Sequence, residues 1–302
     1  MNTIKVISKN IYDVNFDGKD HQTNEYNPKL FPTSVKLKGI FEKRASKNNL
    51  AIAENIFFKN IKKLEAMPGF RWNHDMNLAG YHTAGHNRNN YKSTFGAFRY
   101  LNQFSFFIDY FNFSTNLENK HILDIGPWSG ATCLLYEALG AKVDAIEEAN
   151  YQTHIMNFLK KSFNCSFKIY AKSLYQFNEH NKYDILMNFG VLYHVTDPLV
   201  FLRICNNALK PGGVMLLETM STNSCPDDSI IRYQGSEVPG GNWYCPNRIA
   251  LSRMLYDAGF TNIKIAGSVN DNNYDRAFAI AERRGNDDAW EPYKGGWSKN
   301  IK

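Results

Sequence analysis

The sequence predicts an α/β fold in which a mainly parallel sheet carries helices on both faces. Short apolar runs typical of buried strands alternate with longer segments whose apolar residues recur every three or four positions. A glycine-containing turn joins one buried run to the helix that follows it, and two strand-like segments close the pattern as an antiparallel hairpin. This order of elements is typical of doubly wound folds, which bind ligands at the carboxyl ends of the strands.

A polar N-terminal extension of about residues 1–116 precedes the sheet. Its expected elements are β-like pieces at residues 4–7 and 34–37, a helix over 48–66 and an aromatic-rich capping helix over 93–111. The extension holds 16 Lys and Arg against 9 Asp and Glu, whereas residues 117–302 hold 19 against 20. This N-terminal charge is compatible with a nucleic-acid-facing surface, but the scattered Lys and Asn residues favour a simple compositional bias.

The strand, turn and helix of residues 121–140 form the most informative segment. Leu123 and Ile125 read as a buried strand with Asp124 near its carboxyl end, and a helix follows from residue 131. Gly126 and Gly130 let the backbone approach a ligand closely. The segment therefore predicts a nucleotide-type cofactor, although an ordinary packing unit would look similar.

Trp128 narrows the type of cofactor. The dinucleotide fingerprint G-x-G-x-x-G has a middle glycine that admits a diphosphate. This chain reads Gly126-Pro-Trp-Ser-Gly130, so an indole occupies the position where a diphosphate needs bare backbone. NAD and FAD are therefore poor candidates, and an adenosine cofactor without phosphate, such as S-adenosylmethionine, fits better.

The remaining elements follow in order along the chain. Residues 142–148 read as a second strand ending in Glu147 and Glu148, and a carboxylate there can accept both hydroxyls of a ribose. The expected elements after it are a helix over 149–163, a strand at 167–170, a central strand that runs into a turn within 183–194 and a helix over 197–209. A break at 210–213, a strand over 214–219 and a hairpin of residues 262–269 and 276–284 follow.

Several motifs resemble a known family. Residues 124–130 resemble motif I of the class I methyltransferases, D/E-x-G-x-G-x-G, with Trp128 in place of the middle glycine. The segments G-V-L-Y-H at 190–194, L-K-P-G-G at 209–213 and L-E-T at 217–219 are similar to the tRNA wobble-uridine carboxymethyltransferases and their relatives. Further similar segments are 232–233, 242–247, 250–260 and the lead-in W-x-H-x-x-x-L at 72–78 with Thr83 and Gly85.

The resemblance covers about residues 70–284 and implies a Rossmann-like class I methyltransferase sheet of seven strands, the last antiparallel, with an N-terminal extension. The expected organisation is therefore an extension and helical cap (1–116), an S-adenosylmethionine-binding domain (117–284) and a C-terminal tail (285–302).

The resemblance also implies the cofactor-binding residues. Asp124 and the backbone of Gly126, Trp128 and Gly130 should hold the amino-acid end, and Glu147, or else Glu148, the ribose. Ser173 and Leu174 lie where the family usually reads the adenine amine with an acid or amide, and the acid is absent here. Asn188 and Phe189 should line the methionine side, with Tyr193 and His194 near the transferred methyl.

The histidines are candidates for a catalytic base. If the acceptor carries a proton, His194, His74 or His82 can remove it, because histidine titrates near neutrality. A hydrogen bond that closes the turn is an equal interpretation of His194. The spacing of His74, His82 and His86 matches no standard metal site, so we expect no metal.

The tRNA enzyme of the family uses a carboxylated cofactor, held according to the resemblance by an upstream lysine, a late arginine and the tyrosine of G-V-L-Y-H. Tyr193 is present, but residues 70–73 contain no Lys and the connection 269–275 is too short for the arginine insertion. Plain S-adenosylmethionine is therefore the expected cofactor.

Three functions remain open: a methyltransferase acting on a small molecule, which we favour, a tRNA wobble-uridine (carboxy)methyltransferase, and a non-catalytic cofactor-binding partner protein. Tyr193, Asp124 and Glu147 argue against the last.

The start of the chain has no apolar signal-like run, no segment is apolar enough to span a membrane, and the five cysteines show no zinc spacing, so we expect a cytoplasmic protein. Cys225 and Cys245 are the two that could approach each other.

Overall fold

The computed structural model describes residues 11–13, 31–70, 72–83, 99–222, 225, 227–235, 241–267 and 275–284. Within these residues, eight strands form one sheet in the order β1-β11-β12-β8-β7-β4-β5-β6. The strands are β1 (Ile11–Asp13), β4 (His121–Ile125), β5 (Lys142–Ile146), β6 (Lys168–Tyr170), β7 (Tyr183–Phe189), β8 (Leu209–Ser221), β11 (Phe260–Gly267) and β12 (Asp275–Arg283).

Strand direction confirms the expected sheet. Strand β12 runs antiparallel to both of its neighbours, and the other pairings are parallel. The seven strands from β4 to β12 therefore form the predicted sheet with its last strand reversed. Strand β1 adds an edge strand beside β11 that the sequence did not reveal, while the β-like piece at 4–7 lies outside the described residues.

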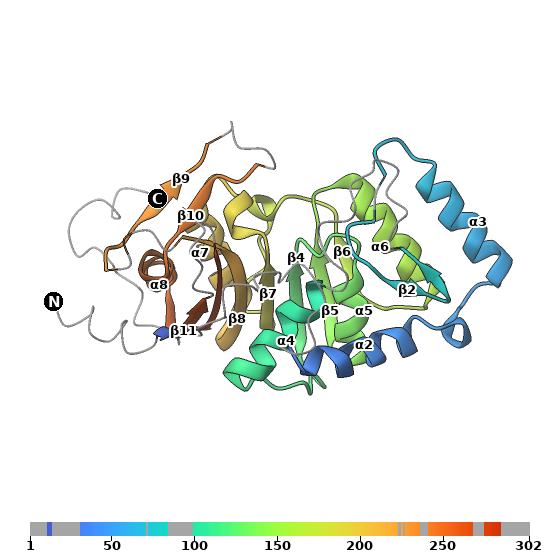
Figure 1. Ribbon diagram of the computed structural model, residues 1–302, viewed down its shortest axis with the longest axis horizontal. Helices are drawn as coiled ribbons and strands as arrows, with labels where there is room; N and C mark the ends of the chain where they lie inside the picture. The colour runs from blue at the N-terminus through green and yellow to red at the C-terminus, as the bar shows by residue number, and fades with distance from the viewer. Residues whose placement is uncertain are drawn as a thin grey trace.

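The sheet is buried between two helical layers. Successive residues of each strand face opposite sides of the sheet, so each face contributes to its own buried cluster. On β4, Ile122 belongs to one buried cluster and Leu123 to the other. The first cluster contains residues of α2 (Thr33–Arg44), α3 (Glu54–Glu65), α4 (Arg99–Phe111), α5 (Ala131–Ala138) and α6 (Asn150–Ser162). Helix α3 packs on α6 at one end of the molecule (Figure 1). The second cluster contains residues of α7 (Pro198–Ala208) and α8 (Arg248–Asp257).

Aromatic stacking fixes α4 on the sheet. The ring of Phe106 lies 3.7 Å from that of Phe278 on β12, and the ring of Phe107 lies 5.3 Å from that of Phe189 on β7, centroid to centroid. Phe41 of α2 packs in turn against Tyr100 of α4. Residues before and after position 116 therefore contribute to a single buried cluster.

Two segments of the extension differ from expectation. Residues 34–37, expected to be β-like, lie in α2, because Ser34, Leu37 and Phe41 are buried at helical spacing. The helix expected over 48–66 begins only at Glu54, after the 3-10 turn η1 (Lys47–Asn49). Extended backbone intervenes, and Ala51 donates its N–H to the carbonyl of Ser162. The capping helix begins at Arg99, and residues 84–98 are outside the described part.

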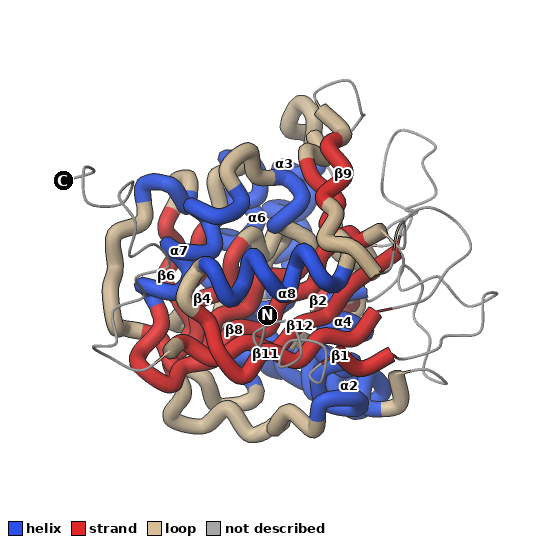
Figure 2. Tube along the Cα trace, turned by 90° about the vertical axis from the view of Figure 1, so that its left-hand side faces the viewer, coloured by secondary structure: helices blue, strands red, loops and turns tan. Residues whose placement is uncertain are grey.

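The predicted break at 210–213 is a bulge within β8. Leu209 pairs with Tyr183 and Val214 with Ile185, so four residues are accommodated between pairs that are two residues apart on β7. Two small hairpins lie outside the sheet: β2 (Asn77–Leu78) with β3 (Tyr81–His82), and β9 (Ile231–Tyr233) with β10 (Tyr244–Pro246). The β9–β10 hairpin extends from the body of the molecule (Figure 2).

Candidate functional site

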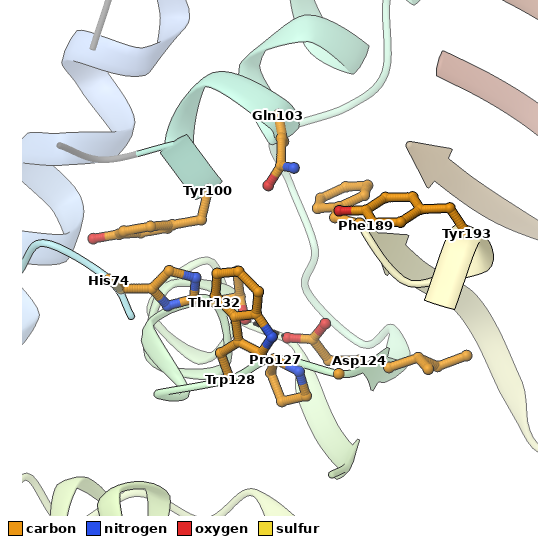
Figure 3. Close-up of a pocket in the computed structure, with 12 residues that line it drawn as sticks. His74, Tyr100, Gln103, Asp124, Pro127, Trp128, Thr132, Phe189 and Tyr193 are labelled. Atoms are coloured by element: carbon orange, nitrogen blue, oxygen red, sulfur yellow. Dashed lines mark hydrogen bonds between the residues drawn. The ribbon is translucent and has the colours of Figure 1, made fainter. Parts of the chain in front are cut away.

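A cavity that is open to solvent lies at the carboxyl ends of β4 and β7, and about 430 Å³ of empty space, open solvent included, lies within it. These adjacent strands lie where the strand order reverses, which is where doubly wound sheets bind ligands. The lining comes from the turn after β4, the turn after β7, helix α4 and the segment before β2 (Figure 3). The lining residues are His74, Tyr100, Gln103, Asp124, Ile125, Gly126, Pro127, Trp128, Thr132, Phe189, Gly190 and Tyr193.

The turn after β4 requires glycine at two positions. Gly126 has a φ of 63°, and a Cβ there would lie 2.9 Å from Cγ2 of Val191. Gly130 has a φ of 76°, and a Cβ there would lie 2.9 Å from Cγ of Met156. Both the left-handed backbone and the close packing therefore exclude a side chain. The turn leaves backbone exposed to the cavity beside Asp124.

Asp124 is a buried carboxyl group at the floor of the cavity. It is 3% exposed, and Thr132 donates its hydroxyl to Oδ2. Burial raises the pKa of Asp124 to about 7, against the lowering effect of Thr132 and with a smaller contribution from the charge of Glu147. Among the described residues no Lys or Arg forms an ion pair with this carboxyl. Such a group can bind a cationic ligand group.

Glu147 lies directly after β5, next to the same turn. Its Oε2 accepts the N–H of Trp128 at 3.1 Å and its Oε1 accepts that of Ala149 at 2.9 Å. The residue is 6% exposed, and burial raises its pKa to about 7. Glu148 is exposed, so of the two acids Glu147 is the one that contacts the glycine turn beside the cavity.

Three rings in a row close one side of the cavity. The centroid of the His74 ring lies 5.7 Å from that of Trp128 and 4.8 Å from that of Tyr100. The His74 segment is fixed to the glycine turn because Asn73 donates its N–H to Oγ of Ser129 at 3.2 Å. Figure 3 shows Trp128 between His74 and Asp124.

A buried polar chain lies at the opposite end. Gln103 of α4 donates Nε2 to Oε2 of Glu218 at 2.9 Å, and Nε of Arg276 forms an ion pair with Oε1 of the same carboxylate. Cζ of Arg276 lies 5.0 Å from the centroid of the Tyr193 ring. Glu218 is 0% exposed, so this end of the site contains a charge-balanced pair. Trp243 fixes the backbone of Tyr193 by donating its N–H to the Tyr193 carbonyl at 2.7 Å.

A late arginine reaches this end from β12 and not from the connection 269–275. Arg276 is the second residue of β12, and the strand places its guanidinium beside the ring of Tyr193. The described residues at 70 and 72–73 contribute no Lys, as expected.

The structure brings some predicted site residues to the cavity and not others. Asp124, Gly126, Trp128, Phe189, Tyr193 and His74 line it, and Gly130 and Glu147 adjoin the turn. Eight predicted residues are not in its lining, and two of these are Gly130 and Glu147. Of the other six, Glu148 and His82 are exposed, and His194 is exposed with Nδ1 3.2 Å from the Gly241 carbonyl. Ser173 is half-buried beside η2 (Leu174–Gln176), Leu174 is buried in the second core cluster, and Asn188 is fully buried.

Sequence reasoning missed Tyr100, Gln103, Thr132, Glu218 and Arg276. For Gln103 a signal was present, because an amide among the aromatic residues of a capping helix is unusual on a buried face. The cue for Arg276 was a charged residue within an otherwise apolar closing strand. The pairing of these two residues through Glu218 depends on tertiary contacts that no local pattern encodes.

In the described ranges, no group of three His, Cys, Asp or Glu side chains is arranged to hold a metal ion, and no helix there has the length and apolarity of a membrane span. All five cysteines are free, with Cys225 exposed and Cys245 buried.

A sheet with this strand order and a cavity at its switch point, flanked by two buried carboxyl groups, defines a Rossmann-like nucleoside-cofactor domain. Residues 99–265 match a family model described as a methyltransferase domain. Because the match spans more than half of the chain, the chain belongs to this family.

Individual relatives are partial matches. The chain is 31% identical over 156 residues to a tRNA U34 carboxymethyltransferase of Pseudoalteromonas atlantica, covering 50% of this chain and 47% of the relative. It is 28% identical over 132 residues to a ubiquinone biosynthesis O-methyltransferase of Xanthomonas campestris pv. campestris, covering 43% and 54%. The chain therefore spans about half the length of the curated relatives it matches. The N-terminal domain of EvdMO1, solved with SAH bound, shares the fold with a TM-score of 0.56 at 14% identity, covering 77% of this chain and 98% of that chain.

Proposed function

We propose that this protein is an S-adenosylmethionine-dependent methyltransferase that acts on a polar small molecule. The observation that carries the proposal is the pair of buried carboxyls, Asp124 and Glu147, on the two sides of a glycine turn at the switch point of the sheet. Membership of the methyltransferase-domain family and a fold shared with the SAH-bound domain of EvdMO1 support it.

The residues present fit such a cofactor. Gly126 lines the cavity beside Asp124, and burial raises the pKa of both Asp124 and Glu147 to about 7, so each carboxylate would gain from a ligand that supplies hydrogen-bond donors or positive charge. Asp124 would hold the amino-acid end, and Glu147 the ribose hydroxyls. When bound, S-adenosylmethionine supplies an electrophilic methyl group.

The chain's own residues then have positioning roles. The rings of Trp128, His74 and Tyr100 exclude water from one side, and Tyr193 and Gln103 present polar groups at the other end of the cavity. Holding an acceptor in line with the methyl supplies much of the acceleration, because orientation removes an entropic barrier. If the acceptor carries a proton, His74 is the histidine of the lining that would accept it.

The first test is calorimetric titration of the intact chain with S-adenosylmethionine, S-adenosylhomocysteine and NAD. We expect micromolar binding of both sulfur cofactors and none of NAD. NAD binding without a response to either sulfur cofactor would refute the proposal. A mass-spectrometric screen of polar metabolites for a gain of one methyl group then identifies the acceptor.

A second candidate is modification of the tRNA wobble uridine. Arg276 beside Tyr193 favours it, because a cation is available at that end, and a tRNA U34 carboxymethyltransferase is among the relatives. Glu218 already balances the charge of Arg276, so an added carboxylate would gain less there than beside an unpaired cation. We therefore expect plain S-adenosylmethionine to bind at least about tenfold tighter than its carboxylated form.

Competition between the two cofactors decides between these candidates. Tighter binding of the carboxylated form, together with mass gain on tRNA, would move the tRNA function to first place. Cofactor binding with no transfer to any small molecule or tRNA would instead indicate a non-catalytic binding protein. A cytoplasmic location is part of the proposal and is supported by the five free cysteines.

A further inference from the structure

Trp128 has an unusual backbone for its residue type. Its φ is 50°, in the left-handed region that favours glycine. Within the described residues, eight non-glycine positions have a positive φ; five of them are Asn, which tolerates this conformation, and two others are the small residues Ala79 and Cys225. Trp128 is the one bulky residue of this set. A strained position at a cavity is a reason to ask what the side chain does.

The backbone of Trp128 does not explain the indole. Its N–H donates to Glu147 at 3.1 Å, and glycine would offer the same donor with no steric strain. The side chain, by contrast, lines the cavity beside Asp124 and packs against His74, which packs against Tyr100. What glycine could not supply is therefore the ring.

We propose that Trp128 is a specificity-determining residue whose indole forms the wall against which the amino-acid part of the cofactor packs. This inference rests on the proposed function. An ammonium group held by Asp124 would lie beside an aromatic face, which attracts cations and excludes water from the pair. The same ring occupies the space that a diphosphate needs, so the pocket takes cationic aminoacyl nucleosides rather than phosphate-bearing nucleotides.

Three substitutions separate the ring from the backbone. Trp128→Phe keeps a ring, Trp128→Ala removes the ring but keeps the strain, and Trp128→Gly removes both. Calorimetry with S-adenosylhomocysteine should give an affinity within about threefold of wild type for Phe and about tenfold weaker for Ala and Gly. Trp128→Gly should nevertheless unfold at a higher temperature than Trp128→Ala, because glycine relieves the left-handed strain.

Adenosine is the second probe, because it lacks the amino-acid part. Its affinity should be equal in all three variants and wild type. A loss for adenosine as large as that for S-adenosylhomocysteine would overturn the inference, since the ring would then act on the nucleoside or on the fold. Asn119→Gly is a matched control: Asn119 is exposed, has a φ of 61° and lies in the turn before β4, so its replacement should leave binding unchanged.

The two proposals fail in different ways. If wild-type protein binds neither S-adenosylmethionine nor S-adenosylhomocysteine, the proposed function fails. If wild type binds both and Trp128→Gly binds them as tightly, the function stands and the role of the indole is refuted.

Discussion

The affinity for S-adenosylhomocysteine should depend steeply on pH between pH 6 and 8. Burial raises the pKa of both Asp124 and Glu147 to about 7 in the free protein. A carboxyl group can pair with an ammonium, or accept two ribose hydroxyls, only after it has lost its proton. Each proton that must leave before the ligand binds weakens the affinity at acidic pH.

The size of the effect follows from the pKa. A carboxyl with a pKa of about 7 is about one-eleventh ionised at pH 6 and about ten-elevenths ionised at pH 8, so each one changes the affinity roughly tenfold. Two independent groups would give about a hundredfold, or about 3 kcal/mol. Because the charge of Glu147 raises the pKa of Asp124, the protons leave in coupled steps. The observed change should therefore lie between about tenfold and a hundredfold.

Calorimetry at pH 6, 7 and 8, in two buffers with different heats of ionisation, measures both the affinity and the protons released. Glu147→Gln should bind more weakly at pH 8 by about 1–3 kcal/mol and retain only the pH dependence of Asp124. Adenosine, which has no ammonium group, should report Glu147 alone. An affinity of wild type that changes less than about twofold over this range would refute the reasoning, because the two carboxyls would then not exchange protons for ligand.

Three further predictions concern stability and turnover. A carboxyl whose pKa is raised on folding stabilises the fold below its unfolded pKa near 4, and this contribution is lost as the pH rises through about 7. The unfolding free energy of Asp124→Asn, relative to wild type, should therefore rise by up to about 4 kcal/mol between pH 4 and 8. Urea titrations measure this difference, and a difference independent of pH would contradict the burial of Asp124. Tyr193→Phe should lower turnover on the acceptor by at least about tenfold with little change in the affinity for S-adenosylhomocysteine. His194 is exposed, so His194→Ala should keep turnover within about threefold of wild type. Steady-state methyl transfer measures both, and an equal loss in the two variants would restore His194 as a catalytic group. Phe106→Ala should lower the unfolding free energy by about 3–5 kcal/mol, because the stack of Phe106 on Phe278 is lost. The control Ile56→Ala, at an exposed position, should lower it by less than about 0.5 kcal/mol. Chemical denaturation measures both values, and similar values for the two variants would rule out this packing.

The sheet could be predicted because short stretches of sequence carry the signals for its strands and helices. Apolar runs, helical spacing and glycine breaks predicted the order of strands and helices from 121 to 219 and the closing hairpin, but not α8 or the β9–β10 hairpin. The position of an acid at a strand end made Asp124 and Glu147 candidates for the site. Edge strand β1 was not predictable, because three residues without alternation carry no periodic signal. The segment at 34–37 was misread because four residues fit either a strand or a helix turn.

The end of the cavity near Gln103, Glu218 and Arg276 was harder to predict for a different reason. Gln103 meets Glu218 across 115 positions of sequence, and Arg276 meets it across 58. Contacts of this kind depend on how α4 and β12 pack on the sheet, and no spacing rule expresses that packing. Similarly, Asn188 and Leu174 lay at suitable places in the chain but are buried within the protein core.

Because α2 packs on α4, the family match and the buried core of this chain begin at different residues. The homologous family segment begins at residue 99, yet that residue starts a helix whose buried side is covered by Phe31 and Phe41 from the extension. The segment that matches the family is therefore smaller than the structural unit that buries the aromatic side of α4. A chimera joined at residue 99 would leave the aromatic side of α4 without Phe31 and Phe41, which cover it. Exchange of the extension between relatives therefore requires the matching face of α4 to be exchanged as well.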